Sequence, residues 1–415
     1  MASAMQDFGD RPVPEGRRSA AMRIGVTTGA WIIAMSTFFT GGVLANGMSF
    51  GAMAAAAVLG QAMLGFVGFL TALAGARARV STAMLAREVY GVAGGRVIAL
   101  LVGLVLGVGW FAWQLSFFGQ TIATAFGGTA FTTPGMTMLW GAVVTTVSVL
   151  FGFRLLSFVS AFAVPAILAL SFYGLSLSIG RAGGIGTLVS AHGAGQALPM
   201  LAAIGLVIGN GIVGTVMFPD LSRFARHPVA GAAAAAIGYA AAGTVILLCG
   251  AAIVLAARAA PGDLPGAMAA VGMGVPAFIV LIVAQWATNK GNLYSGALSL
   301  VAATGLDQKL ATVLLGMCGL AMALAGIQDR FVPLLTFLGA FMPPIAAGLV
   351  VQKLLFVRSA PAGPIGLVAV LVGGVAGYLA PLTGVALPAP FVAFIMGGLA
   401  HALLVRMAAA RSGPR

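Results

Sequence analysis

Long apolar segments recur along almost the whole chain, and they constrain its fold more than any other feature. Hydrophobic residues make up 60% of the sequence and charged residues only 7%, whereas roughly 25% are charged in soluble domains. A helix that crosses a bilayer needs about 20 mostly apolar residues. The sequence therefore predicts an all-α integral membrane protein. We expect twelve membrane helices, at residues 24–44, 52–73, 97–125, 136–152, 157–179, 198–217, 229–257, 275–300, 310–325, 331–355, 365–380 and 390–405.

The basic residues lie mainly in the short segments between these helices. The net charge is +13, but this distribution is typical of the cytoplasmic loops of a membrane protein and argues against nucleic acid as a partner. With the N-terminus inside, 17 of the 21 basic residues are cytoplasmic, three (Arg181, Arg258 and Arg330) are outside, and Lys290 fits neither side. The bias predicts an even number of spans and two cytoplasmic termini.

Two of the expected helices contain clusters that disfavour a continuous helix. The first contains Ser36-Thr37 and Thr40-Gly41-Gly42, and the sixth contains Gly209-Asn210-Gly211 and ends at Pro219-Asp220. Glycine weakens a helix, and unpaired backbone in a bilayer persists only where it faces protein or a water-filled cavity. Paired interruptions in corresponding halves indicate the binding site of a secondary transporter. Close packing of helices is the alternative explanation for each single glycine.

The two interrupted helices are five apart in the expected order, which predicts two inverted repeats of five helices followed by two C-terminal helices. We expect one transporter domain between two cytoplasmic tails. The tails are residues 1–23 and 407–415, the domain is 24–406, the repeats are about 24–180 and 198–356, and the last two helices are about 364–406.

An aromatic and amide pair stands out in the third expected helix. Trp110 and Gln114 are four residues apart, so they share one helix face. An indole offers a flat stacking surface, and a primary amide both donates and accepts hydrogen bonds. The pair suits a planar ring edged with N–H and C=O groups. The alternative is an interfacial aromatic belt with a glutamine bonded between helices.

A polar stretch at residues 285–294 interrupts the eighth expected helix. It includes Gln285, Thr288, Asn289 and Lys290. Polar groups at bilayer depth are costly and usually mark a solute or ion site. Thr288 offers a hard oxygen for a cation, although a membrane threonine often bonds its own helix instead.

Lys290 allows two interpretations. A displaced helix would let its ammonium reach the cytoplasmic interface. Alternatively, the ammonium replaces or competes with a coupling cation, so that a proton drives transport. No catalytic cluster, metal-ligand spacing or phosphate-binding loop is visible in the sequence, so we expect neither an enzyme nor a bound cofactor.

These residues resemble the nucleobase:cation symporter-1 family, most closely its bacterial cytosine permeases. The similarity runs over nearly the whole chain, and the order and spacing of its motifs carry it. The motifs are Pro12-Val13-Pro14, Thr40-Gly41-Gly42, Leu85-Ala86-Arg87, Tyr90-Gly91-Val92, Val108-Gly109-Trp110-Phe111, Ala163-Val164-Pro165-Ala166, Asp220, Arg223-Phe224, Trp286-Ala287-Thr288-Asn289, Leu293-Tyr294 and Pro343-Pro344.

The resemblance implies a LeuT-like fold with alternating access, and it implies roles for particular residues. Trp110 would stack under a substrate ring, and Gln114 matches an amide of hydantoin transporters. Ala287 and Thr288 match two hydroxyl residues of the family's sodium site, and carbonyls near Ala30 and Ala34 would complete that site.

Several positions depart from the family pattern. The asparagine that reads cytosine aligns to Ala284, beside Gln285. The aromatic residue that closes over the ring aligns to Gly211, beside Asn210. One sodium-site hydroxyl is replaced by Ala287, and Lys290 occupies an acidic position. Asn210, Gln285 and Asn289 remain candidates for reading the polar edge of the substrate.

The sequence thus predicts a monomeric permease of a bacterial inner membrane. We expect it to import cytosine or a related planar heterocycle with Na⁺ or H⁺. The alternatives are a permease for hydantoin, allantoin, hydroxymethylpyrimidine or an amino acid on the same fold, and a membrane sensor that binds ligand without transporting it.

Overall fold

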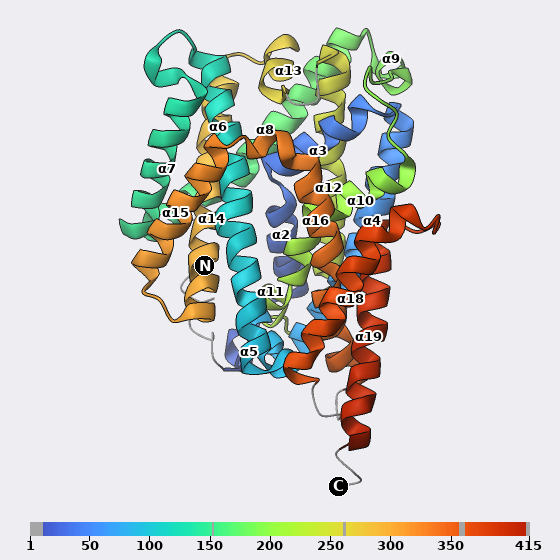
Figure 1. Ribbon diagram of the computed structural model, residues 1–415. Coiled ribbons are helices and arrows are strands. Elements are labelled where there is room, and N and C mark those ends of the chain that lie inside the picture. The colour runs from blue at the N-terminus through green and yellow to red at the C-terminus, as the bar shows by residue number, and fades with distance from the viewer. Residues whose placement is uncertain (1–10, 152, 260–262, 357–361, 412–415) are drawn as a thin grey trace.

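The computed structural model describes residues 11–151, 153–259, 263–356 and 362–411, and these are helical almost throughout (Figure 1). Eight helices in this part of the chain are long and apolar enough to cross a membrane, or up to ten if each of two bent pairs forms one span. Many large apolar side chains point outward, among them Phe66, Val97, Met317 and Leu371. An apolar exterior of this kind fits a lipid environment.

The first expected helix is broken, as predicted, but at a different place. α2 (Ala21–Ile32) and α3 (Met35–Asn46) are bent by 59° at the junction. Ala34 between them has extended backbone, with φ −140° and ψ 157°. Residues 40–42 lie within α3, so these glycines do not form the break.

The sixth expected helix is continuous where we predicted an interruption. α10 (Met200–Val216) runs through Gly209-Asn210-Gly211 and ends only at Met217, followed by the short α11 (Pro219–Ser222). A Cβ at Gly209 would lie 2.1 Å from the carbonyl oxygen of Leu335. The prediction of a break at these residues is therefore wrong. Gly209 lets α10 and α16 (Phe331–Phe341) pack closely, and this close packing does not require α10 to lose its helical hydrogen bonds.

The third expected helix starts earlier than predicted. α5 (Thr82–Leu104), the π-helical η2 (Val105–Trp110) and α6 (Phe111–Phe126) form one apolar span from Thr82 to Phe126. Gly91 bends α5, with φ 70° and ψ 176°. Such backbone lies outside the regions that residues with a Cβ favour, so glycine fits here.

The other expected segments match helices with shifted ends, whereas two short helices, at Ile185–Ser190 and Leu264–Ala270, lie between expected segments. The C-terminal helix continues past residue 406 to Arg411, and residues 412–415 of the predicted tail lie outside the described part. These helices are α4 (Phe50–Ala78), α7 (Pro134–Phe151), α8 (Phe153–Ala182), α9 (Ile185–Ser190), α12 (Pro228–Ala257), α13 (Leu264–Ala270), α14 (Val275–Thr304), α15 (Gln308–Leu324), η4 (Ile327–Arg330), α16 (Phe331–Phe341), α17 (Pro343–Val350), η5 (Val351–Leu355), α18 (Gly366–Leu379) and α19 (Ala389–Arg411), with short turns η1 (Glu15–Arg17), η3 (Ala130–Thr132), η6 (Gly363–Ile365) and η7 (Ala380–Leu382).

Small residues hold the broken helix against α12. A Cβ at Gly250 of α12 would lie 1.9 Å from the carbonyl oxygen of Phe38, and one at Gly41 would lie 2.0 Å from that of Leu247. Backbones approach this closely only where side chains are absent, which is how helices associate in a bilayer. α12 therefore fixes α2 and α3 in the middle of the bundle.

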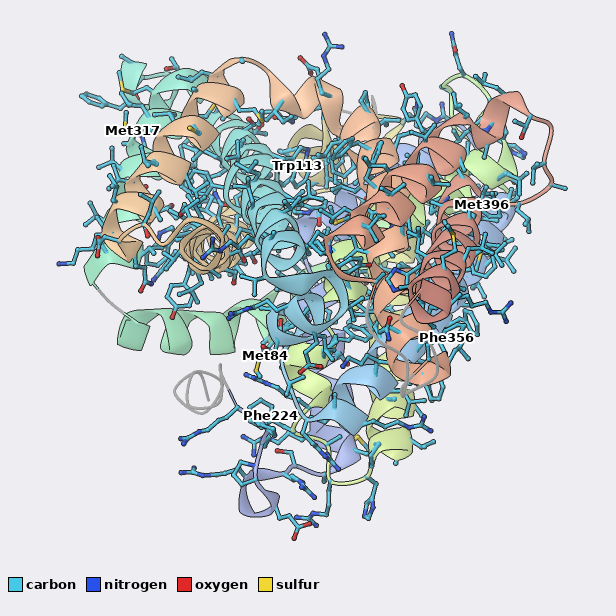
Figure 2. All side chains as sticks on the ribbon, turned by 60° about the horizontal axis from the view of Figure 1, so that its bottom comes forward. Met84, Trp113, Phe224, Met317, Phe356 and Met396 are labelled. Atoms are coloured by element: carbon cyan, nitrogen blue, oxygen red, sulfur yellow. The ribbon has the colours of Figure 1, made fainter. Side chains whose placement is uncertain are left out.

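The interior of the bundle is aromatic. Figure 2 shows Trp113 at its centre, whereas Met317 and Met396 lie at the periphery. The Trp113 side chain is fully buried, and its ring stacks on Phe117 with centroids 5.5 Å apart and an interplanar angle of 7°. This core lies beside the break between α2 and α3, because Phe39 of α3 packs edge-on against Trp113 at 5.3 Å.

Candidate functional site

A cavity of about 300 Å³ lies where the break between α2 and α3 meets η2, α6, α10, α12 and α14. Its size and its mixed aromatic and polar lining are typical of a small-molecule site. The lining residues are Trp31, Ile32, Ala34, Ser36, Thr37, Leu106, Trp110, Gln114, Asn210, Val213, Gly214, Met217, Tyr239, Thr288, Gly291, Asn292 and Ser295.

The cavity extends from the middle of the bundle toward one end. Its lining runs along α10 from Asn210 to Met217 and along α14 from Thr288 to Ser295. Both helices descend in Figure 1 toward the end where α19 terminates. Asn210 is buried, whereas Met217 and Ser295 are partly exposed. Along α10 the exposure of the lining therefore increases toward that lower end.

Aromatic rings close the opposite side. Phe331 of α16 packs against Phe39 with ring centroids 4.9 Å apart and against Trp113 at 4.7 Å. Phe117 completes this barrier, which we define as Phe39, Trp113, Phe117 and Phe331. All of these side chains are almost fully buried. The barrier separates the cavity from the upper end of the bundle.

Trp110 and Gln114 line the cavity together, as their spacing on one helix face predicts. Trp110 ends the π-helical turn η2, a type of turn that occurs often at functional sites. The Trp110 ring is 6.4 Å from Phe331 and 6.2 Å from Trp113, so the barrier fixes its position. Gln114 is 2% exposed, and among the described residues its buried Oε1 has no hydrogen-bond partner.

Asn210 connects α10 to the break in the first helix. Its Nδ2 donates to Thr37 Oγ1 at 3.0 Å, and that hydroxyl donates to the Ile32 carbonyl at 2.8 Å. The Ile32 carbonyl also accepts from the Ala34 N–H at 2.9 Å. This chain of bonds satisfies backbone that the break leaves free. Asn210 Oδ1 is buried without a partner in the described part of the protein.

Gly211 does not face the cavity. Its carbonyl accepts from Tyr239 Oη at 2.8 Å, and a Cβ at Gly211 would lie 2.6 Å from Leu64 Cδ1 and 3.3 Å from that hydroxyl. The aromatic side chain expected here from the family pattern would not fit. Tyr239 of α12 lines the cavity and brings an aromatic ring to it from another helix.

Gln285 and Asn289 lie on the side of α14 that faces α6, next to the cavity-lining residues. Gln285 Nε2 donates to Thr121 Oγ1 at 3.0 Å, and Asn289 Nδ2 donates to the Phe111 carbonyl at 3.2 Å. Both therefore bond α14 to α6. Their predicted contact with substrate remains a prediction, and the described geometry does not bring them to the cavity with Trp110.

The residues predicted to bind a cation do not all lie in one place. Ala34 and Thr288 line the cavity, Ala30 lines an apolar groove beside α8 and α12, and Ala287 is buried. Thr288 Oγ1 donates to the Ala284 carbonyl at 3.0 Å, which leaves its lone pairs available to accept or coordinate. Ala30 and Ala287 have no side-chain oxygen, so their part in a cation site rests on backbone carbonyls.

Lys290 is fully buried and does not line the cavity. Its Nζ lies 4.5 Å from the centroid of the Trp286 ring, a cation–π contact. Within the described residues the ammonium has no hydrogen-bond partner. The interpretation in which Lys290 reaches the cytoplasmic interface is wrong, because its side chain packs inside the bundle along α14.

Several lining residues were absent from our predicted site, namely Trp31, Ser36, Thr37, Tyr239, Asn292 and Ser295. Thr288, Asn292 and Ser295 recur at helical spacing, so periodicity within α14 offered a signal. Tyr239 gave no such signal, because it stands alone among small residues in α12.

Comparison with known proteins identifies the family. The sequence family described as "Permease for cytosine/purines, uracil, thiamine, allantoin" matches residues 12–409. The chain belongs to this family. It is a multi-pass membrane transporter rather than an enzyme.

Relatives and solved structures agree with this assignment. Cytosine permease of Escherichia coli strain K12 is 29% identical over 349 residues, covering 84% of this chain and 81% of the relative. The inward-facing conformation of Mhp1 superposes with a TM-score of 0.84 at 19% identity, covering 96% of this chain and 93% of that one. Mhp1, a nucleobase-cation-symport-1 family transporter, in a closed conformation with bromovinylhydantoin bound has a TM-score of 0.77 at 19% identity, over 97% of this chain and 96% of that one. These likenesses give the fold.

Proposed function

We propose that this permease imports cytosine or a related planar nitrogen heterocycle by cation symport through the cavity at the α2–α3 break. The observation that carries the proposal is an indole beside two buried amide oxygens without partners, Gln114 Oε1 and Asn210 Oδ1. An unsatisfied buried acceptor costs about 1–3 kcal/mol. A ligand that brings N–H groups to these oxygens removes that cost.

Cytosine has the matching chemistry. Its flat ring stacks on the Trp110 indole, and base–aromatic stacking is worth about 1–3 kcal/mol. Its amino group and ring N–H supply donors for Gln114 and Asn210, while its carbonyl can accept from an amide N–H. The permease relatives in Escherichia coli are named for cytosine, which supports the same substrate class.

The membrane arrangement follows from the same helices. We propose twelve spans with both termini cytoplasmic. α2 and α3 form one span, and α14 and α15 form two, since they turn by 119° at their junction. The apolar α7 adds another. In this orientation the cavity faces the cytoplasm. The two inverted five-helix repeats within 24–356, and the monomeric state, remain predictions.

The coupling cation is Na⁺ or H⁺ in this proposal. For Na⁺, the Thr288 hydroxyl and backbone carbonyls near Ala34 would supply hard oxygen ligands at the edge of the cavity. For H⁺, the buried Lys290 ammonium is the candidate proton carrier. Lys290 lies over the Trp286 ring of α14 and does not line the cavity, so it would act through the position of that helix.

The test is uptake into proteoliposomes of labelled cytosine, uracil, adenine, hydantoin and a neutral amino acid, with and without Na⁺ and pH gradients. We expect a planar heterocycle to accumulate only when one cation gradient is present. If only the amino acid accumulates, the substrate is an amino acid whose carboxylate binds at the N-terminal end of α3, and the proposal of a heterocyclic substrate is wrong. Binding without accumulation under any gradient would indicate a sensor.

Trp110→Ala tests the site itself. We expect the affinity for the substrate to fall between about fivefold and about a hundredfold, because the stacking contact is lost. Trp140→Ala is the matched control, because Trp140 is an exposed tryptophan of α7 that donates to the Phe131 carbonyl outside the cavity. Equal uptake by both variants would remove the stacking role of Trp110.

A further inference from the structure

A second cavity of about 300 Å³ lies above the aromatic barrier, on the side away from the central cavity. We call it the upper cavity. Its lining comes from the end of α3, from α6, from the segment before α10, from η4 and from α16, which lie at or near the upper end of the bundle in Figure 1. The lining residues are Phe39, Val43, Asn46, Gly47, Gln120, Gln196, Leu198, Leu206, Gln328, Asp329, Phe331 and Val332.

The polar side chains that line the upper cavity are mostly primary amides. Four primary amides, those of Asn46, Gln120, Gln196 and Gln328, converge from separate segments, and Asp329 adds a carboxylate. No lysine, arginine or histidine lines it. Amides both donate and accept, and a carboxylate accepts only. This set suits a neutral ligand rich in N–H and C=O groups, and it does not suit an anion.

The floor of the upper cavity is aromatic. Phe39 and Phe331 line it and also belong to the barrier. Phe331 reaches toward Trp110 on the other side, with ring centroids 6.4 Å apart. Phe331 thus lies between the upper cavity and Trp110 of the central cavity, and each cavity combines an aromatic surface with amides.

One hydrogen bond spans the upper cavity. Gln328 Nε2 donates to Gln120 Oε1 at 2.5 Å and connects η4 to α6. Both side chains are only partly buried, so a ligand can reach them. A heterocycle with a donor and an acceptor on one edge can replace this amide–amide bond without leaving either amide unpaired.

We propose that the upper cavity is a second binding site for the transported heterocycle, which occupies it before the barrier opens. This inference rests on the proposed function, because the ligand is the same. Asp329 and the four amides would hold the polar edge of the ring, and Phe39 and Phe331 its face. In the proposed orientation, a solute from outside reaches this site first.

The experiment counts bound molecules in the purified full-length protein by equilibrium dialysis, using whichever labelled heterocycle the uptake panel identifies. We expect two molecules per chain in the wild type and one in Trp110→Ala. The double variant Gln120→Leu/Gln328→Leu should still bind the molecule in the central cavity. Its affinity for the molecule in the upper cavity should fall roughly three- to tenfold or more. Gln308→Leu, at an exposed amide on α15, is the matched control and should bind two.

A second approach avoids variants that fold poorly. Gln196 is exposed, so Gln196→Cys, in a Cys318→Ser background, can be labelled with a bulky methanethiosulfonate after folding. Cys249 is buried. Labelling should remove one of two bound molecules and reduce uptake more at low than at saturating substrate.

The outcomes separate the two proposals. One molecule per chain in the wild type, lost in Trp110→Ala and unaffected by labelling at position 196, overturns the upper site and leaves the proposed function standing. If no member of the panel binds or is transported, the proposed function fails.

Discussion

Two regions of this permease were expected to interrupt their helices, and only one does so. The first span breaks at Ile33 and Ala34, where there is no glycine, and α10 passes unbroken through Gly209-Asn210-Gly211. The break is held by hydrogen bonds from Thr37 and the Ala34 N–H to the Ile32 carbonyl. The glycines of α10 instead admit neighbouring backbone and rings.

The comparison teaches that the hydrogen-bond partners available to the backbone decide where a membrane helix breaks. Free backbone groups in a bilayer must be satisfied, and Asn210 supports the break through Thr37 from a helix 173 residues away in sequence. Glycine permits a break but does not stabilise one. The two regions are therefore complementary, since α10 stays continuous and supplies the amide that supports the broken helix.

The largest expected effect comes from Gly209→Ala. If this glycine served to weaken α10, alanine would stabilise the helix by about 1 kcal/mol. Because a Cβ there would meet the Leu335 carbonyl at 2.1 Å, we instead expect destabilisation of about 3 kcal/mol or more. Thermal unfolding in detergent measures the difference. Gly51→Ala, in α4 with open space around its Cβ position, serves as the control and should be neutral or slightly stabilising.

A smaller effect is expected when the bridge between the two regions is cut. Thr37→Val removes the hydroxyl that joins Asn210 to the Ile32 carbonyl and leaves the asparagine unpaired, at a cost of about 1–2 kcal/mol. We expect reduced uptake, with activity largely restored in Thr37→Ser. Thr40 provides a control, since its hydroxyl donates to the Ser36 carbonyl within the same helix. If Thr37→Val transports like Thr40→Val, the bridge is not needed for function.

The smallest stability change is expected at Lys290, in a helix that neither breaks nor supports a break. Lys290→Met keeps the length of the side chain and removes a buried charge, so we expect a gain of roughly 1 kcal/mol in stability. If a proton drives transport through this ammonium, uptake should respond to a pH gradient in the wild type and lose that response in the variant. A strict Na⁺ requirement in both proteins argues against the proton role.

Much of the architecture was predictable because lipid imposes simple rules. The apolar segments mark membrane helices, and the spacing of Trp110 and Gln114 placed both on one cavity. The assignment of Gln285 and Asn289 to the same cavity was not supported, since both bond to α6 instead. In a membrane, the lipid-facing and protein-facing sides of a helix are both apolar, so the pattern does not show which side faces a cavity.

The sequence by itself determined the membrane class, the family and the helical face shared by Trp110 and Gln114, because local periodicity and bilayer thickness act on neighbouring residues. Only the tertiary structure decided the position of the break, the burial of Lys290 against Trp286 and the entry of Tyr239 into the site. Each of these depends on which helices meet, and contacts between distant segments set the partners of buried polar groups.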